Sequence, residues 1–137
     1  MITLQQAIDT AFSTVRTLRT EPINFVQATG RILAHDVFAD ADMPPFNKSA
    51  MDGYACRRDD LGKELEVLEV IPAGKTPTFP IGPGQCSKIM TGAQVPESAD
   101  LVFMVEYAEE TANGQVRFTG EKSNSNICLK AEDLKLG

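Results

Sequence analysis

The chain has 137 residues, of which 42% are hydrophobic, and a formal net charge of −6 at pH 7. This length and apolar content favour one compact domain, or one domain with an arm, and allow a hydrophobic core. The thirteen lysines and arginines are scattered, which argues against nucleic-acid binding, and no apolar run approaches the roughly 20 residues of a membrane span.

The clearest predicted element is an N-terminal amphipathic helix over residues 3–19. Thr3 and Gln6 fit a capping box, and apolar residues recur behind them at helical spacing. These residues are Leu4, Ile8, Ala11, Val15 and Leu18, with Phe12 beside them. Such a helix either docks on its own domain or forms a dimer contact, and the sequence leaves both open.

The segment that follows is predicted to be short and irregular. Pro22 lies in a break after the helix, and residues 25–26 are predicted to be extended. Residues 28–34 are predicted to form one or two helical turns, which Gly30 weakens. Residues 36–39 are predicted to be a short strand.

The remainder of the chain predicts short strands separated by turns. These strands cover residues 65–71, 86–90, 101–106, 116–119 and 127–129. Asn113-Gly114 is a hairpin signal, whereas residues 73–84 and 123–126 are predicted loops. The predicted fold class is therefore α+β: a helical arm over residues 1–24, then a small, mostly β domain with irregular loops over residues 25–137. That domain is expected to run back into the arm domain near the C-terminus, and the abrupt end after residues 130–135 suggests a fragment.

The cysteines and the single histidine argue against a zinc site and against a disulfide framework. Cys56, Cys86 and Cys128 are an odd number of widely spaced cysteines without a CxxC pair. We expect Cys56 to be a small buried apolar residue rather than a nucleophile, and His35 to lie at the surface. A reducing, cytoplasmic setting is the simplest interpretation.

The most distinctive segment is the run PPFNKSAMDGYA at residues 44–55. Its two prolines fix φ and lack N–H groups, so they hold the chain extended and out of a β-ladder. Asp52-Gly53 is a turn signal. We therefore expect an ordered loop in which Ser49 can donate to a phosphate and Asp52 can bind Mg²⁺ or orient a water. A plain hairpin turn is the alternative.

Two further segments can carry chemistry. Within residues 89–96, Thr91 offers a hydroxyl, and Gly92 is expected to let a ligand approach bare backbone N–H groups. The pattern is not a P-loop, because the second glycine and the Gly-Lys-Ser/Thr run are absent. Residues 130–133 bring together a lysine and two carboxylates, including Asp133, which can serve a metal or a phosphate. The alternatives are an ordinary turn and a solvated face.

Taken in this order, the segments resemble the molybdopterin molybdenumtransferases of molybdenum-cofactor synthesis, known as MoeA in bacteria and as the E domain of gephyrin in animals. The run at residues 44–55 matches the family's most distinctive motif, IMTGAQVP at residues 89–96 matches its second, and ATGRILA at residues 28–34 matches the usual lead-in. The sequence departs at Asn47-Lys48, where many members have Asp followed by Asn or Arg, and at Ala131, where the family usually has glycine.

The resemblance implies insertion of molybdate into adenylylated molybdopterin with release of AMP, assisted by Mg²⁺. It implies that Asp52 holds Mg²⁺ and that Thr91, with the Gly92 backbone, binds a phosphate or the adenylate. Ser49 is implied to contact a phosphate or to support the residues that do, and Asp133 is implied to add to the environment of the cation. Family members also contain a molybdopterin-binding α/β domain and a further β domain, so this chain alone is expected to be inactive.

The resemblance also implies partners. A homodimer is expected through the N-terminal arm and the missing C-terminal domains, and a molybdopterin adenylyltransferase is a further expected partner. Small-molecule substrates are expected, with neither nucleic acid nor membrane. The alternative function is a non-catalytic scaffold or dimerisation module that contributes only protein contacts.

Overall fold

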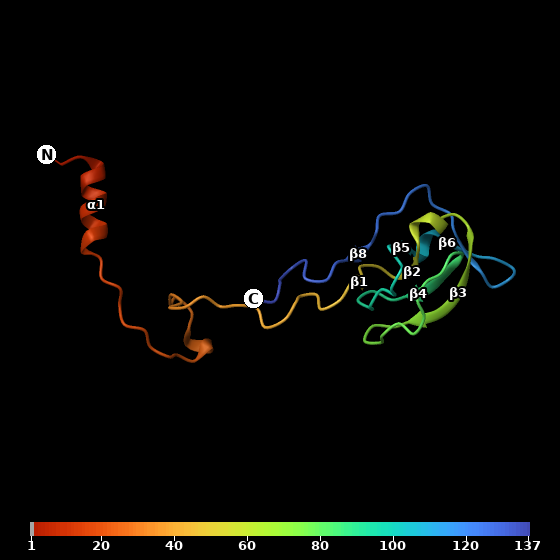
Figure 1. The fold of residues 1–137 in the computed structure, drawn as a ribbon, viewed down its shortest axis with the longest axis horizontal. Helices are drawn as coiled ribbons and strands as arrows, with labels where there is room; N and C mark the ends of the chain where they lie inside the picture. Colours follow the sequence, from red (N-terminus) through yellow and green to blue (C-terminus); the bar gives the residue numbers. More distant parts are fainter. Residues whose placement is uncertain (1) are drawn as a thin grey trace. The chain divides into compact units, whose positions relative to one another are not determined.

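A computed structural model describes residues 2–137 of the chain, which divides into two compact units, Met1–Val37 and Phe38–Gly137 (Figure 1). The predicted domain boundary after residue 24 stays a prediction, because compactness alone does not define a domain. The fold class is confirmed: one N-terminal helix precedes a mostly β unit with a curled sheet.

The predicted N-terminal helix exists but is shorter than expected. Helix α1 spans Leu4–Thr14, and its capping box is confirmed: the Gln6 N–H donates to Thr3 Oγ1, while Gln6 Oε1 accepts from the Thr3 N–H. The hydroxyls of Ser13 and Thr14 donate back to carbonyls of the preceding turn, and Val15 turns to an extended conformation. Ser and Thr that bond the backbone in this way favour helix ends.

The remaining elements predicted in the first unit are wrong. Residues 25–26 belong to a short 3-10 helix, Phe25–Gln27, in which the Val26 N–H donates to the Asn24 side chain. Residues 28–34 are irregular instead of helical, with a turn at Thr29-Gly30 where Gly30 has φ of +80°. No residue between 2 and 37 is buried, so no packing within this unit supports a helix of weak propensity.

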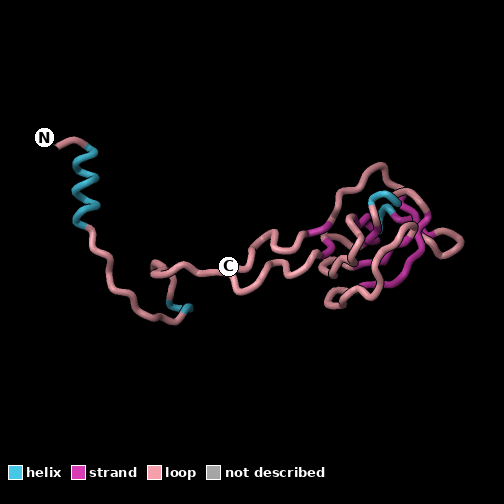
Figure 2. The backbone as a smooth tube through the Cα atoms, in the orientation of Figure 1, coloured by secondary structure: helices cyan, strands magenta, loops and turns pink. Residues whose placement is uncertain are grey.

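Within residues 38–137, six strands form one sheet in the order β5-β2-β4-β3-β7-β6. Strands β3 and β4 are parallel, and the other neighbouring pairs are antiparallel. A second, two-stranded sheet joins β1 to β8 (Figure 2). The bounds are β1 Lys48–Ser49, β2 Gly53–Cys56, β3 Glu64–Ile71, β4 Gln85–Ile89, β5 Leu101–Met104, β6 Ala108–Glu110, β7 Val116–Phe118 and β8 Ile127–Cys128.

Most of the strand predictions are confirmed. The predicted hairpin is present as β6 and β7, and its turn contains Gly114 with φ of +74°. Strand β5 is shorter than predicted, because a 3-10 helix at Val105–Tyr107 follows it. The strand predicted at residues 36–39 is wrong, since these residues pair with no described strand.

The main correction concerns residues 44–55, which were predicted to form a loop throughout. Lys48 and Ser49 form β1, and residues 53–55 belong to β2, which lies between β4 and β5 and is buried along its whole length. Gly53 does not occupy a turn. A Cβ at this position would lie 2.0 Å from the Phe103 carbonyl oxygen, so glycine is needed here for close strand packing rather than for a positive φ.

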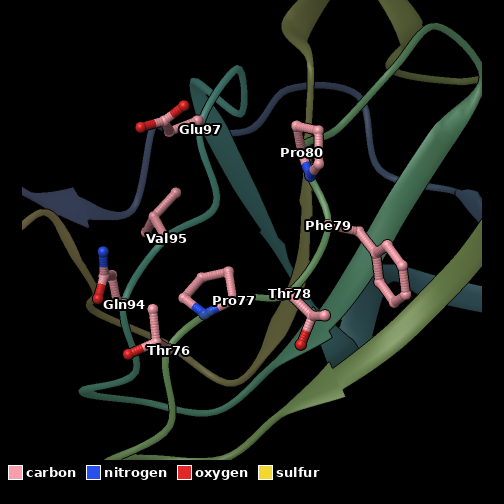
Figure 3. Close-up of a pocket in the computed structure, with 8 residues that line it drawn as sticks. All are labelled: Thr76, Pro77, Thr78, Phe79, Pro80, Gln94, Val95 and Glu97. Carbon is pink, nitrogen blue, oxygen red and sulfur yellow. The ribbon is translucent and has the colours of Figure 1, made fainter.

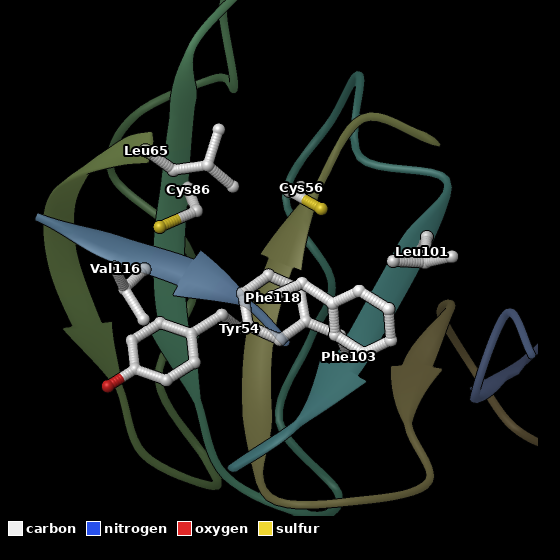
Figure 4. Packing of buried hydrophobic residues seen from close by; sticks show 8 residues of the cluster. All are labelled: Tyr54, Cys56, Leu65, Cys86, Leu101, Phe103, Val116 and Phe118. Atoms are coloured by element: carbon white, nitrogen blue, oxygen red, sulfur yellow. The ribbon is translucent and has the colours of Figure 1, made fainter. Parts of the chain in front are cut away.

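Side chains from both faces of the sheet are buried. One cluster is shown in Figure 4 and comprises Tyr54, Cys56, Leu65, Cys86, Leu101, Phe103, Val116 and Phe118. The opposite face buries Ala55, Ile71, Ile89, Ala93, Val95 and Val102. Alternate residues of β2 therefore enter different cores, as expected from the period of a strand.

The predicted burial of Cys56 and the predicted surface position of His35 are confirmed. Cys56 and Cys86 are fully buried, and desolvation raises the pKa of each thiol to about 12. His35 is exposed. Among residues 2–137, no helix has the length and apolar character required to cross a membrane.

Candidate functional site

Asp52 and Thr91 meet at one end of the sheet. Asp52 directly precedes β2 and Thr91 follows β4, and the antiparallel register places Gly53 opposite Ile89. The Asp52 Oδ1 atom accepts two hydrogen bonds from Thr91, at 2.7 Å from the backbone N–H and at 2.6 Å from the hydroxyl. Strand pairing thus joins two predicted site residues that lie 39 positions apart.

The carboxylate of Asp52 is exposed and is held in its charged form. The Thr91 hydroxyl has the largest effect in lowering the pKa of Asp52, followed by the Thr91 N–H, because both donate to the charged carboxylate. Both bonds end on Oδ1, and no described residue donates to Oδ2. One oxygen of an anionic carboxylate therefore remains open to a ligand.

Ser49 lies beneath this pair rather than on its surface. Only 1% of the residue is exposed, and its hydroxyl donates to the Met51 carbonyl at 2.6 Å. The predicted donation to a phosphate would require the hydroxyl to leave this bond.

Gly92 supplies a backbone conformation, with φ of +82°. The expectation of bare N–H groups in this loop is wrong, because three successive donors are already used. The N–H of Thr91 donates to Asp52, that of Gly92 to the Ser49 carbonyl at 2.8 Å, and that of Ala93 to the Met90 carbonyl at 3.0 Å. The loop is therefore not a nest for an anion in this conformation.

Asp133 is not brought to the Asp52–Thr91 pair. Its N–H donates to the Met43 carbonyl on a ribbon that extends the pairing of β1 with β8. Among the described residues, no group of three or more His, Cys, Asp or Glu side chains could hold a metal. Any shared role of Asp133 and Asp52 must therefore involve a ligand or further protein.

Asn47 was left without a role by sequence reasoning, and the structure supplies one. Its Oδ1 accepts from the Lys130 N–H at 2.8 Å, and its carbonyl accepts from the Val95 N–H at 2.9 Å. Asn47 thus ties the returning C-terminal strand to the loop after Thr91. An aspartate could accept the same bond, which explains how either residue can occupy this position.

A pocket of about 230 Å³ lies beside the same loop (Figure 3). Glu69 Oε1 fixes one wall by accepting from the N–H groups of Thr78 and Phe79. The lining residues are Thr76, Pro77, Thr78, Phe79, Pro80, Gln94, Val95 and Glu97. None of the five predicted site residues is among them, so this pocket is separate from the Asp52–Thr91 pair.

Comparison with known proteins identifies relatives of the chain. Residues 2–137 match the model of the MoeA N-terminal region, domains I and II. The chain is 41% identical over 125 residues to a molybdopterin molybdenumtransferase of Staphylococcus epidermidis, covering 84% of this chain and 29% of the relative. It is 38% identical over 125 residues to a protein of the same name from Nostoc, covering 86% and 29%.

The fold has a counterpart among solved structures. A molybdopterin biosynthesis moeA protein from Pyrococcus horikoshii superposes with a TM-score of 0.78 at 30% identity, covering 97% of this chain and 37% of that chain. The chain thus spans about 30% of the length of the curated relatives it matches.

Proposed function

The chain belongs to the MoeA N-terminal region family, and we propose that it is the N-terminal part of an enzyme that inserts molybdate into adenylylated molybdopterin and releases AMP. The observation that carries this proposal is the Asp52–Thr91 pair. Strand pairing brings the two residues together, so that Asp52 Oδ1 accepts two hydrogen bonds from Thr91 and Oδ2 is left open. Both residues come from the two motifs that the family resemblance rests on.

The residues present fit a magnesium site completed by substrate. Mg²⁺ is usually held by one or two carboxylates together with waters and substrate phosphates, and Asp52 offers one exposed, anionic carboxylate. When bound, Mg²⁺ supplies neutralisation of negative charge on phosphate oxygens, which cleavage of a phosphoanhydride requires. Asp52 would hold the ion through Oδ2, and Thr91 would keep the carboxylate oriented and ionised.

The remaining predicted residues take lesser roles in this proposal. Gly92 allows the turn that places Thr91, and its N–H is engaged by Ser49. Asp133 would approach the substrate only from its own place on the ribbon. Positive charge for molybdate and phosphate would come from protein outside this acidic chain, consistent with its net charge of −6. We therefore propose the activity for a longer protein, one that also contains the parts of the relatives that this chain does not match.

A chimera tests this function. This chain would replace the matching N-terminal region of the Staphylococcus epidermidis relative, and molybdate insertion would be measured with Mg²⁺ present. We expect activity in the chimera, a loss of about 100-fold in kcat/KM for Asp52→Asn, and a smaller loss for Thr91→Val, which keeps the backbone donor.

The matched control is Asp59→Asn. Asp59 is an exposed carboxylate beyond the opposite end of β2, with only a 3.6 Å contact to Arg57. Its replacement should leave kcat/KM unchanged. Full activity of the Asp52→Asn chimera would sink the assignment of Asp52, and an inactive but folded parent chimera would count against the function itself.

A second role, as an assembly module, is favoured by the N-terminal unit. Helix α1 has 11 residues and buries none of them, and isolated helices of this length are marginal in water. Leu4, Phe12 and Val15 are at least 70% exposed. We propose that another copy of the chain covers this apolar stripe. Light scattering with and without residues 1–37 tests this role, and a monomer in both cases would contradict it.

Other aspects of the family expectation stay proposals. A molybdopterin adenylyltransferase is proposed as a partner, because it would deliver the adenylylated substrate. A cytoplasmic location is proposed from the reduced, buried thiols of Cys56 and Cys86.

A further inference from the structure

We propose that Ser49 is a positioning residue that fixes Asp52 and Thr91 against each other by bonding the neighbours of both. The inference deepens the proposed function in what the pair does, but the positioning itself rests on geometry alone. Ser49 contacts neither carboxylate oxygen. It acts through Met51 on one side and through Gly92 and Ala93 on the other.

The main chain of Ser49 holds the loop that carries Thr91. The Ser49 N–H donates to the Ala93 carbonyl at 2.9 Å, and the Ser49 carbonyl accepts from the Gly92 N–H at 2.8 Å. These two bonds fix the residues directly after Thr91. They also explain why Gly92 keeps its positive φ while its N–H is turned toward β1.

The side chain of Ser49 holds the turn that carries Asp52. Its hydroxyl donates to the Met51 carbonyl at 2.6 Å and lies 3.4 Å from the Met51 nitrogen. No other described group donates to that carbonyl. The next residue is Asp52, whose own carbonyl accepts from the Val105 N–H at 3.0 Å. Ser49 and Val105 therefore hold the backbone on both sides of the carboxylate's Cα.

The burial of Ser49 suits this role better than substrate contact. At 1% exposure, the Ser49 hydroxyl is out of contact with solvent, and its bond to the Met51 carbonyl satisfies a buried donor that would be costly to leave unpaired. Alanine at this position keeps both main-chain bonds and removes only the bond to Met51. The side-chain contribution can therefore be tested separately from the fold.

The test is NMR spectroscopy of this chain without substrate or metal. In Ser49→Ala we expect the Thr91 amide proton to move toward its position in Asp52→Ala, with hydrogen exchange at least about tenfold faster. Ser49→Thr retains the hydroxyl and should keep both signals close to wild type. If Ser49→Ala does not fold, Ser49→Cys, whose thiol is a weak donor, should give an intermediate shift.

Val116→Ala is the matched control, because Val116 is fully buried in the cluster around Tyr54 and Phe103 and forms no contact with the Asp52 turn in the described hydrogen bonds. It should lower stability without moving the Thr91 amide signal. A Thr91 signal unchanged in Ser49→Ala, or moved equally by Val116→Ala, would overturn the proposal. The NMR test measures no activity, so an inactive chimera would not contradict the positioning role of Ser49. An unchanged Thr91 signal would likewise not contradict the proposed enzyme activity.

Discussion

At the scale of single residues, Asp60 shows how a carboxylate can be buried in this fold. Its side chain is 4% exposed and forms an ion pair with Lys63 at 2.7 Å. The Gly84 N–H donates to its other oxygen at 3.2 Å. The bond from Lys63, followed by that from Gly84, lowers the pKa of Asp60. Asp60 thereby links the turn before β3 to the turn before β4.

This arrangement predicts a pH-dependent contribution to stability. A lowered pKa means that the folded state binds the proton more weakly than the unfolded state, whose value is near 3.8. The contribution is therefore fully present above that value and is lost as pH falls through the lower folded pKa. Asp60→Asn should lower Tm at neutral pH and lose less Tm on acidification below about pH 4.

Thermal unfolding followed by circular dichroism across this pH range checks the prediction. The control is Asp59→Asn, since Asp59 is the exposed neighbour, and its Tm curve should parallel that of the unchanged chain. If the Asp60→Asn curve also ran parallel to it, the ion pair would contribute nothing that depends on protonation.

At the scale of elements, β2 decides the geometry of the site. It pairs with β4 and with β5 over all four of its residues. Asp52 and the 3-10 helix at Val105–Tyr107 consequently meet at one end of the sheet, where the Asp52 carbonyl accepts from the Val105 N–H. The strand could not be recognised locally, because it is short and begins with Gly53, and its stability comes from burial on both faces.

Gly53→Ala should disrupt this element. The new Cβ would lie 2.0 Å from the Phe103 carbonyl oxygen, which belongs to a paired backbone. Overpacking of this kind typically costs about 1–3 kcal/mol and sometimes more. Chemical denaturation measures the free energy of unfolding.

Gly82→Ala serves as the comparison for Gly53→Ala. Its Cβ would meet only the end of the Gln85 side chain, at 2.8 Å, and that side chain can move. We expect a loss below about 1 kcal/mol. Equal costs for the two variants would show that close approach to β5 is not the reason for glycine at position 53.

At the scale of the whole molecule, the buried cores lie in the second unit, and the assembly role that we propose lies in the first. Both core clusters consist of residues between 54 and 118, whereas residues 2–37 bury none. Removal of residues 1–37 should therefore leave the unfolding midpoint within the error of measurement while it abolishes self-association. A large drop in the midpoint at a concentration where the full chain is monomeric would contradict this separation.

The sequence by itself determined the features that depend on neighbouring residues. The capping box at Thr3, the hairpin turn at Gly114, and strands β3, β4 and β7 follow from local hydrogen bonding and from the pattern of apolar residues. The three motifs, in their order, also predicted the family. Each of these signals lies within a few residues of the structure it specifies.

The tertiary structure decided the features that depend on distant partners. Residues 28–34 bury no side chain, so the helical pattern there did not become a helix. Strand β2 formed because two other strands cover its edges and two cores cover its faces. The same pairing joined Asp52 to Thr91 across 39 residues and buried Ser49 beneath them, while the ribbon register kept Asp133 apart. No local pattern encodes these outcomes, because strand register fixes which side chains meet.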